Sequence, residues 1–563
     1  MGVEIRSRQV GWRPVISLGL ALFVALVAPR SAYAAAGFPD PSFGTGGFTI
    51  LDDPGVTNEN LTDVAVLGDG KILGAGVHGN SQGFLLARFN PDGSPDGTFG
   101  SGGILVQPDT GVAGGPRGID ALAVGSDGRI VAGGLGRGAT TDAFGFARYL
   151  SDGTPDTGFG DGGVKVVDFG TSAEAFDVDV GPGGVGVGVG KFGDVAGILR
   201  LTSAGQPDPS FGPGGLRTID IPGSITDQAL SVDVLDDGSV LVAGFASPGG
   251  WVAKLDSSGN PVPGFGTGGV FRDQFGAGPT DVAEPFDIQA LPGGSILLAG
   301  DSFSGGSGQL FAARIGASGG LDPDFGSGGL FLANPTADSD AAFALATFED
   351  RIVLAGLQGA GTTGGDTWLL RLRADGTLDQ TFGQGGQTVR SAATGFDYAA
   401  GLALQPDGKP LVAGEADIPA PQLLVGRFTA DLRCRGKLPT RLGSAGADVI
   451  TGTAGPDVIL GFGGRDRISG DGGIDTICAG NGDDSVNGGN GNDIVLAGAG
   501  MDLAIGGPGN DLLIGGAGGD RLLGGIGGDQ LSGGLGADTL NGGNGRDRCT
   551  GGRGTDTEKS CER

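Results

Sequence analysis

Several residue types that usually build active sites are scarce in this sequence of 563 residues. It contains one histidine, His78, which argues against a metal centre made of histidine ligands and against a Ser-His-Asp triad. Lys and Arg number 35 against 64 Asp and Glu, giving a net charge of −29, which argues against a protein that binds nucleic acid by neutralising phosphates. Beyond the first 36 residues, no apolar run approaches the roughly 20 residues that cross a bilayer.

Glycine, in contrast, is abundant, with 124 residues beside 30 prolines. In an aperiodic chain this much glycine and proline would indicate low complexity or disorder. Hydrophobic residues make up 38% of the sequence, however, which is too many for a solvated tail. The decisive question is therefore whether the glycines are periodic.

The N-terminus has the features of an export signal. Arg6, Arg8 and Arg13 precede an apolar run from Val15 to Ala28, and Ala-Tyr-Ala follows at 32–34. About 14 apolar residues are too few for a membrane anchor. We therefore expect residues 1–34 to be a signal peptide, a mature chain that begins near residue 35, and a secreted, extracellular protein with no membrane span.

The string Phe-Gly-x-Gly-Gly recurs seven times at nearly regular intervals. Between these strings, two short apolar runs flank an Asp-Gly or Gly-Gly pair such as Asp69-Gly70, for which we expect a type I′ hairpin. A third run ends in a basic residue eleven positions before the next phenylalanine, and a fourth follows the glycine pair. The seven strings begin at Phe43, Phe99, Phe159, Phe211, Phe265, Phe325 and Phe382.

Four short strands per unit and seven units predict an all-β fold that begins with a seven-bladed β-propeller over residues 35–432. The chain enters this region at the tail of a unit and leaves it just before that tail would recur. The first strand can therefore complete the last blade and remove the open edge. An open β-solenoid is the alternative architecture.

The units resemble the delta-60 repeats of bacterial secreted proteins. The segment 378–386, Leu-Asp-Gln-Thr-Phe-Gly-Gln-Gly-Gly, matches the L-D-x-x-F-G-x-G-G mark of that family in full, whereas repeat five has Val262 in place of the acid. The resemblance covers about 70% of the chain and implies a β-propeller. It implies no particular activity, because the family has none in common.

The basic residue of each unit has two interpretations. It belongs either to a positive ring that binds an anionic ligand or to an ion pair with the acid three positions before a phenylalanine. We favour the ion pair, because binding sites on propellers usually use blade-specific residues. The seven basic residues are Arg88, Arg148, Arg200, Lys254, Arg314, Arg371 and Arg427, and the acids are Asp40, Asp96, Asp156, Asp208, Asp322 and Asp379.

From Gly443 the period changes to nine residues, with the pattern Gly-Gly-x-Gly-x-Asp-x-apolar-x. This pattern resembles the RTX, or haemolysin-type, calcium-binding nonapeptide. An aspartate stands at every ninth position without a miss. The aspartates that we expect to bind metal are Asp448, Asp457, Asp466, Asp475, Asp484, Asp493, Asp502, Asp511, Asp520, Asp529, Asp538, Asp547 and Asp556.

The nonapeptide spacing suits Ca²⁺ because this ion takes six to eight hard oxygen ligands. Glycines allow positive φ and bring backbone carbonyls inward, and each aspartate adds a carboxylate. Two residues after each aspartate an apolar side chain points inward, in a column from Ile450 to Leu540 that continues with Cys549 and ends at Glu558. We therefore expect residues 443–563 to form a parallel β-roll with about ten Ca²⁺ ions, unfolded without them.

The four cysteines lie in the C-terminal region and fit an oxidising compartment. Local pairing, Cys434–Cys478 and Cys549–Cys561, is the expectation that we favour among the three possible pairings. The second pair, with Glu558, would form the terminal cap that repeat proteins need. Residues 433–442 would form a basic linker between propeller and roll.

The sequence thus predicts a secreted calcium-binding protein. Its propeller would act as an interaction or structural module for an unidentified protein or glycan at the cell surface, and its RTX repeats would fold on Ca²⁺. The alternative is a secreted or surface hydrolase with its active site in the propeller funnel. No catalytic motif such as His-Glu-x-x-His occurs in the sequence.

Overall fold

The computed structural model is an all-β protein, and the expected signal peptide lies outside the residues that it describes. Among the described residues, no helix is long and apolar enough to cross a membrane. The only helical element that we describe is a short 3₁₀ turn, η1 (Pro213–Gly215). The structure describes residues 36–562 except 41, 52–58, 80–82, 109–113, 115–117, 277–281, 305–306, 335–339, 349, 360–365, 391–396, 418–420, 431–433, 436, 438 and 444–445.

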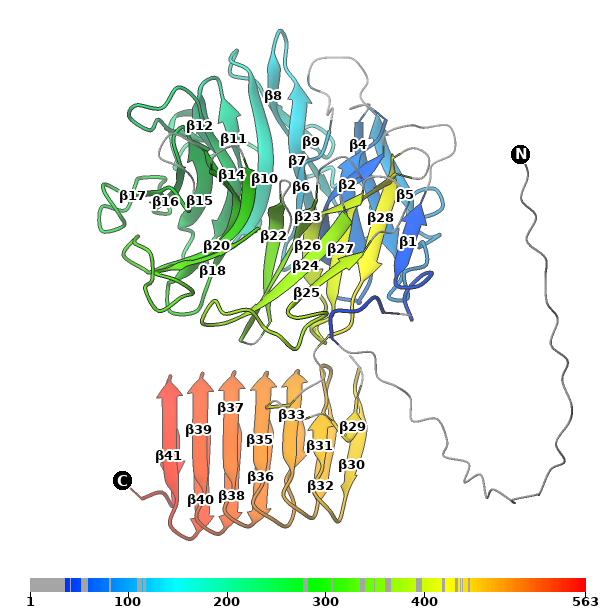
Figure 1. The fold of residues 1–563 in the computed structure, drawn as a ribbon, viewed down its shortest axis with the longest axis vertical. Coiled ribbons are helices and arrows are strands. Elements are labelled where there is room, and N and C mark those ends of the chain that lie inside the picture. Colours follow the sequence, from blue (N-terminus) through cyan, green and yellow to red (C-terminus); the bar gives the residue numbers. More distant parts are fainter. Residues whose placement is uncertain are drawn as a thin grey trace, which may run out of the picture. The chain divides into compact units, whose positions relative to one another are not determined.

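The N-terminal domain is a seven-bladed propeller, as predicted, and each blade is a four-stranded antiparallel sheet (Figure 1). The blades, numbered 1 to 7, are β2 (Asn60–Val66), β3 (Ile72–Val77), β4 (Gly83–Phe89), β5 (Ile104–Pro108); β6 (Ala121–Val124), β7 (Ile130–Arg137), β8 (Asp142–Tyr149), β9 (Val164–Val167); β10 (Ala173–Gly181), β11 (Val185–Phe192), β12 (Val195–Leu201), β13 (Leu216–Ile219); β14 (Asp227–Val234), β15 (Val240–Ala246), β16 (Gly250–Leu255), β17 (Val270–Asp273); β18 (Ala283–Ala290), β19 (Ile296–Ser304), β20 (Ser307–Ile315), β21 (Leu330–Ala333); β22 (Ala341–Phe348), β23 (Arg351–Gln358), β24 (Asp366–Arg373), β25 (Gln387–Arg390); and β26 (Asp397–Leu404), β27 (Pro410–Asp417), β28 (Pro421–Arg427) with β1 (Phe48–Leu51).

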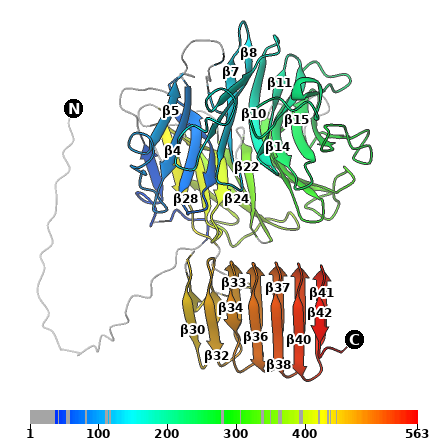
Figure 2. The same cartoon turned by 180° about the vertical axis from the view of Figure 1, so that it is seen from behind.

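The first strand of the chain closes the ring, as the repeat pattern predicts. Strand β1 pairs antiparallel with β28, with Phe48 opposite Gly426 and Leu51 opposite Leu423. The blue and yellow strands therefore lie side by side in both views (Figures 1 and 2). The pairing removes a free edge between the first and last blades.

In blade 1 the turn between the first two strands differs from the expected type I′ hairpin, whereas in blades 3 and 5 both glycines of the pairs Gly183-Gly184 and Gly293-Gly294 have positive φ. In blade 1, Leu67 N–H donates to Lys71 O and Gly70 N–H donates to Leu67 O, so the loop has three residues. Only Gly70 of the pair Asp69-Gly70 has positive φ, at 81°. This geometry is a type I turn followed by a G1 bulge, which needs one left-handed residue rather than two.

The basic residue of the repeat forms an ion pair in six blades, and five of these six arginines are buried. Arg88 Nε donates to Asp96 Oδ2 at 2.7 Å, and the Arg88 guanidinium lies 4.5 Å from the ring centre of Phe99. Arg88 Nη1 also donates to Ser151 O of the next blade at 2.7 Å. The same arginine–aspartate pairing recurs at Arg148, Arg200, Arg314, Arg371 and Arg427. These residues therefore hold blades together, which favours the structural interpretation.

The hydrophobic core of the propeller lies between neighbouring blades. One cluster joins Leu73 and Leu86 of blade 1 to Leu122 and Ile130 of blade 2, and comparable clusters recur between the other blades. The phenylalanine of each repeat string is at most 2% exposed. It therefore serves as a core residue, because an inward aromatic ring fills the wedge between two blades.

The C-terminal domain is a parallel β-roll of two seven-stranded sheets (Figure 1). Each strand pairs with the next strand but one along the chain, as at Leu513 and Leu531, so one coil contains two nonapeptides. One sheet is β29 (Arg441–Leu442), β31 (Val458–Leu460), β33 (Thr476–Asn481), β35 (Ile494–Ala499), β37 (Leu512–Ala517), β39 (Gln530–Leu535), β41 (Arg548–Arg553); the other is β30 (Val449–Thr453), β32 (Arg467–Asp471), β34 (Ser485–Asn487), β36 (Leu503–Pro508), β38 (Arg521–Ile526), β40 (Thr539–Asn544), β42 (Thr557–Lys559).

The interior of the roll is the apolar column that the nine-residue period predicts. From Ile450 to Leu540, the inward residue of every nonapeptide is buried, and Cys549 packs against the end of the column. The turns are so close that a Cβ on Gly509 would lie within bonding distance of Gly491 O. Only glycine fits there, and its φ of 153° is positive as well.

The structure contains two disulfides with the local pairing. Cys434–Cys478 joins the segment before the roll to β33, and Cys549–Cys561 closes the C-terminal end. Strand β29 lies within the segment expected to be a linker and pairs with β31. At the C-terminal end, Glu558 Oε1 accepts the N–H of Gly551 at 2.9 Å.

Candidate calcium site

The aspartates of the nonapeptides lie in two rows, one along each edge of the roll. Each follows a turn glycine and directly precedes a strand, so that equivalent aspartates stand one coil apart on the same edge. The eleven from Asp457 to Asp547 are at most 4% exposed, whereas Asp448 and Asp556 at the two ends are half-buried. Such complete burial is unusual for an ionisable residue without a partner charge.

One oxygen of each carboxylate holds the neighbouring coil. Asp511 Oδ1 accepts the backbone N–H of Asp493 at 2.8 Å, and Asp529 Oδ1 accepts that of Asp511 at 2.9 Å. Bonds of this kind link every aspartate from Asp448 to Asp538 to the aspartate one coil later. This aspartate ladder uses only half of each carboxylate.

The second oxygen of ten of the eleven buried carboxylates lacks a hydrogen-bond partner, whereas Asp457 Oδ2 accepts the N–H and the hydroxyl of Thr453. A buried acceptor without a partner costs about 1–3 kcal/mol, and more when it is charged. Burial accordingly raises the pKa of Asp475, Asp484 and Asp511 to about 6 and that of Asp502 to about 7. The atoms concerned are Oδ2 of Asp466, Asp475, Asp484, Asp493, Asp502, Asp511, Asp520, Asp529, Asp538 and Asp547.

The unpartnered oxygen and a backbone carbonyl of the next coil face the same glycine. A Cβ placed on Gly506 would lie 2.4 Å from Asp511 Oδ2 and 2.6 Å from Gly524 O. The same pair of oxygens surrounds Gly515, Gly524 and Gly533. Glycine at this first position of the nonapeptide therefore leaves a space in which a carboxylate and a carbonyl oxygen converge.

This donor set fits Ca²⁺, which prefers hard oxygen ligands from carboxylates and backbone carbonyls. No group of three His, Cys, Asp or Glu side chains within the described ranges is close enough to hold a metal ion. Backbone carbonyls must therefore supply most ligands, as the glycine-rich turns allow. Two turns of one edge depart from the pattern, because Ala479 and Ala497 occupy the first position before Asp484 and Asp502.

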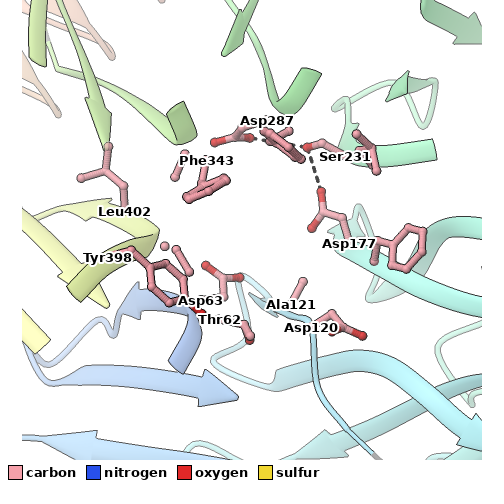
Figure 3. A pocket seen from close by; sticks show the side chains of 16 residues that line it. Thr62, Asp63, Asp120, Ala121, Asp177, Ser231, Asp287, Phe343, Tyr398 and Leu402 are labelled. Carbon is pink, nitrogen blue, oxygen red and sulfur yellow. Dashed lines mark hydrogen bonds between the residues drawn. The ribbon is translucent and has the colours of Figure 1, made fainter. Parts of the chain in front are cut away.

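A second site, which sequence analysis missed, is an axial pocket in the propeller with a volume of about 330 Å³. The innermost strands of all seven blades line it, and its acids are Asp63, Asp120, Asp177 and Asp287. Asp63, Asp177 and Asp287 surround the pocket from three blades (Figure 3). Its aromatic residues are Phe176, Phe286, Phe343 and Tyr398.

Three acids of the axial pocket also connect blades. Asp177 Oδ1 accepts the N–H of Val178, and its Oδ2 accepts the N–H of Val232 in blade 4 at 2.7 Å. Asp63 makes the equivalent bond to blade 2 and Asp287 to blade 6. These carboxylates therefore have a structural role whatever the pocket binds.

The two domains correspond to two known repeat families. The RTX calcium-binding nonapeptide repeat matches in four copies, at residues 442–477, 473–503, 496–531 and 523–558. The β-propeller "domain of unknown function (DUF5122)" matches residues 67–99, 125–159 and 350–382. The chain therefore contains RTX calcium-binding repeats and a DUF5122 β-propeller.

Solved structures resemble the chain only distantly, and a comparison with the curated proteins gives no match. A protein from Lactobacillus plantarum is 13% identical, over 64% of this chain and 96% of that chain, with a TM-score of 0.38. A protein of unknown function from Dyadobacter fermentans is 12% identical over 69% and 99%, and the polysaccharide lyase Uly1 is 11% identical over 70% and 98%, both with a TM-score of 0.38. Likenesses this weak carry no argument about function.

Proposed function

We propose that the aspartate ladder binds several Ca²⁺ ions between successive turns along both edges of the roll, and that residues 443–563 fold on them. The observation that carries this proposal is the set of ten buried Oδ2 atoms without a partner in the two rows, eight of which face a glycine at the first position of their turn. Bound calcium would supply the positive charge that these carboxylates lack. The thirteen aspartates from Asp448 to Asp556 are the proposed ligands, together with turn carbonyls.

The residues of each nonapeptide have different roles in calcium binding and in the folding of the roll. The aspartate holds the preceding coil through Oδ1 and presents Oδ2, while the first glycine leaves room beside that oxygen. The apolar column contributes one buried side chain per nonapeptide, which is a narrow core. Because burying an unpaired carboxylate costs several kcal/mol, such a core cannot offset ten of them. The roll should therefore be largely unfolded without calcium.

Hydrogen exchange followed by mass spectrometry tests this on the full mature chain, because it reports on roll and propeller separately. We expect peptides between Ile450 and Leu540 to exchange rapidly in EDTA and to become protected in millimolar Ca²⁺, with no comparable gain in Mg²⁺, which demands a tighter octahedral site. Propeller peptides serve as the internal control. Equal protection of the roll in EDTA and in calcium would refute calcium-dependent folding.

We also propose that the protein is secreted and works outside the cell. The N-terminal signal motif supports export, and the two disulfides fit an oxidising compartment. Extracellular calcium, at about 10⁻³ M, would suffice for sites of modest affinity. N-terminal sequencing of protein from the culture medium should find a mature chain that begins near residue 35; an uncut N-terminus beginning at Met1 would contradict this.

The propeller is proposed to act as an interaction or structural module for a protein or glycan at the cell surface. The alternative, a hydrolase with its site in the funnel, would draw on the acids of the axial pocket. The interaction role has the better support, because Asp63, Asp177 and Asp287 already accept backbone N–H groups from two blades each. Pull-downs from cell-surface extracts with the full mature chain, in calcium and in EDTA, test for a partner.

A further inference from the structure

The axial pocket combines aromatic rings with carboxyl groups around its wall, where Phe176 precedes Asp177 and Phe286 precedes Asp287. The ring centres of Phe286 and Phe343 are 5.3 Å apart at 66°, and those of Phe343 and Tyr398 are 6.1 Å apart at 75°. These three residues, the aromatic arc, come from blades 5, 6 and 7 and are half-buried. Their edge-to-face chain is a stable arrangement that leaves ring surface facing the pocket.

Four carboxyl groups line the pocket, and no basic side chain does. Burial raises the pKa of Asp63 to about 6 and that of Asp287 to about 7, and repulsion from Asp63 adds to the shift at Asp287. Burial also raises the pKa of Asp120 to about 7. The nearby base Lys191 is already paired with Glu174 at 2.6 Å. Burial raises the pKa of Asp177 as well, so a bound cation would stabilise the charged forms of these carboxyl groups, for which the pocket lining supplies no base.

This combination indicates an organic cation rather than a metal ion. A metal ion needs several oxygens that converge on one point, whereas both carboxylate oxygens of Asp63, Asp177 and Asp287 already accept backbone N–H groups. An alkylammonium group is larger, spreads its charge over several methyl or methylene groups, and is attracted by aromatic faces within about 6 Å. The volume of about 330 Å³ is also within the range of small-molecule pockets.

We propose that the axial pocket binds an alkylammonium group, held between the aromatic arc and the carboxylates of Asp63, Asp120 and Asp177. The group could belong to a small amine or to a lysine side chain of a partner. The proposal does not depend on calcium binding by the roll. Phe343 is its central residue, because its ring contacts both other members of the aromatic arc.

Isothermal titration of the full mature chain in calcium tests the proposal with matched ligands. Choline and its neutral isostere 3,3-dimethylbutan-1-ol differ essentially in charge. We expect choline to bind saturably and the neutral alcohol to bind at least about tenfold more weakly. n-Butylamine and a lysine tripeptide with blocked ends then distinguish a free amine from a lysine side chain. If all three cations bind no better than about 10 mM, or if the alcohol equals choline, the proposal is wrong.

Single substitutions test whether choline binds in the axial pocket. Phe343→Leu should weaken choline binding about tenfold, whereas Phe348→Leu, the same substitution later on β22 and outside the axial pocket, should leave it unchanged. Asp120→Asn should also weaken choline binding, because it removes a carboxylate from the pocket. It breaks no inter-blade hydrogen bond of the kind that Asp63 accepts. Unchanged circular dichroism and melting temperature establish that each variant is folded. Equal choline affinity in folded Phe343→Leu and wild type would overturn the assignment.

Discussion

Replacing one ladder aspartate by asparagine should have opposite effects with and without calcium. In Asp511→Asn the amide oxygen can still accept the N–H of Asp493, so the ladder bond is preserved. The amide nitrogen takes the place of the unpartnered Oδ2, and the buried charge disappears. The calcium-free roll should therefore gain stability, while the calcium-bound roll should lose a ligand.

The magnitude follows from the carboxyl group itself. Burial raises the pKa of Asp511 from 3.8 to about 6, and the residue is 2% exposed. Since the folded-state pKa is raised, the carboxylate destabilises the calcium-free fold at pH values above about 6. At pH 8 this amounts to about 3 kcal/mol, which the asparagine removes. Amides of β37 should then be up to about a hundredfold better protected in EDTA.

The assay is hydrogen exchange at pH 8, once in EDTA with trimethylamine oxide to favour the compact state and once in saturating calcium. Asp483→Asn is the matched control, because Asp483 lies in the same roll but is less buried, and its Oδ1 accepts the N–H of Met501. We expect Asp511→Asn to raise protection in EDTA and to lower it in calcium. A change of the same sign under both conditions, or an equal effect of Asp483→Asn, would refute the reasoning.

Four further predictions concern individual contacts. Gly506→Ala places a methyl group against Asp511 Oδ2 and Gly524 O, so calorimetry should detect the loss of bound calcium near that turn. The control Gly519→Ala should bind calcium normally, because its Cβ would meet its nearest neighbour at 3.3 Å. Asp379→Asn removes the carboxylate that pairs with the buried Arg371 and should destabilise the propeller by about 3–5 kcal/mol, visible as a lower melting temperature. Because the raised pKa values of Asp63 and Asp287 make their charged forms unfavourable in the folded state, the propeller should melt at a higher temperature at pH 5 than at pH 8, and a change in the opposite direction would contradict this. Cys549→Ser with Cys561→Ser removes a disulfide worth about 3 kcal/mol, so exchange should accelerate in β41 and β42 but not in β33.

The roll could be predicted from the sequence because its period is short and strict. A coil of two nonapeptides places equivalent residues directly beside one another, so an apolar residue two positions after every aspartate must form one column. The ladder hydrogen bonds were not predicted, although the same geometry produces them. Sequence spacing shows that aspartates stack, but it does not show which oxygen of Asp511 accepts a hydrogen bond from the preceding coil.

The axial pocket could not be predicted, because it depends on β-bulges. In six innermost strands the pairing register skips one residue, as between Ala175 and Asp177, so that the skipped Phe176 and the following aspartate both line the pocket. An alternating pattern would have placed them on opposite sides of the sheet. The residue types also differ from blade to blade, from Thr62 to Phe343, so the repeat pattern carries no signal for them.

The propeller and the roll differ in whether their buried carboxylates are neutralised by bases of the chain. This difference predicts that the two domains unfold separately. In the propeller, a buried aspartate such as Asp379 is neutralised by Arg371 and Arg351. In the roll, no ion pair joins any of the ten aspartates with a free Oδ2 to a base among the described residues. The propeller thus neutralises repeat aspartates such as Asp379 with its own arginines, whereas the roll has no base beside any of these ten aspartates among the described residues. Calorimetry of the full chain should therefore show two transitions, and EDTA should abolish the one that belongs to the roll while leaving the propeller transition in place. A single transition that shifts as a whole with calcium would contradict this separation.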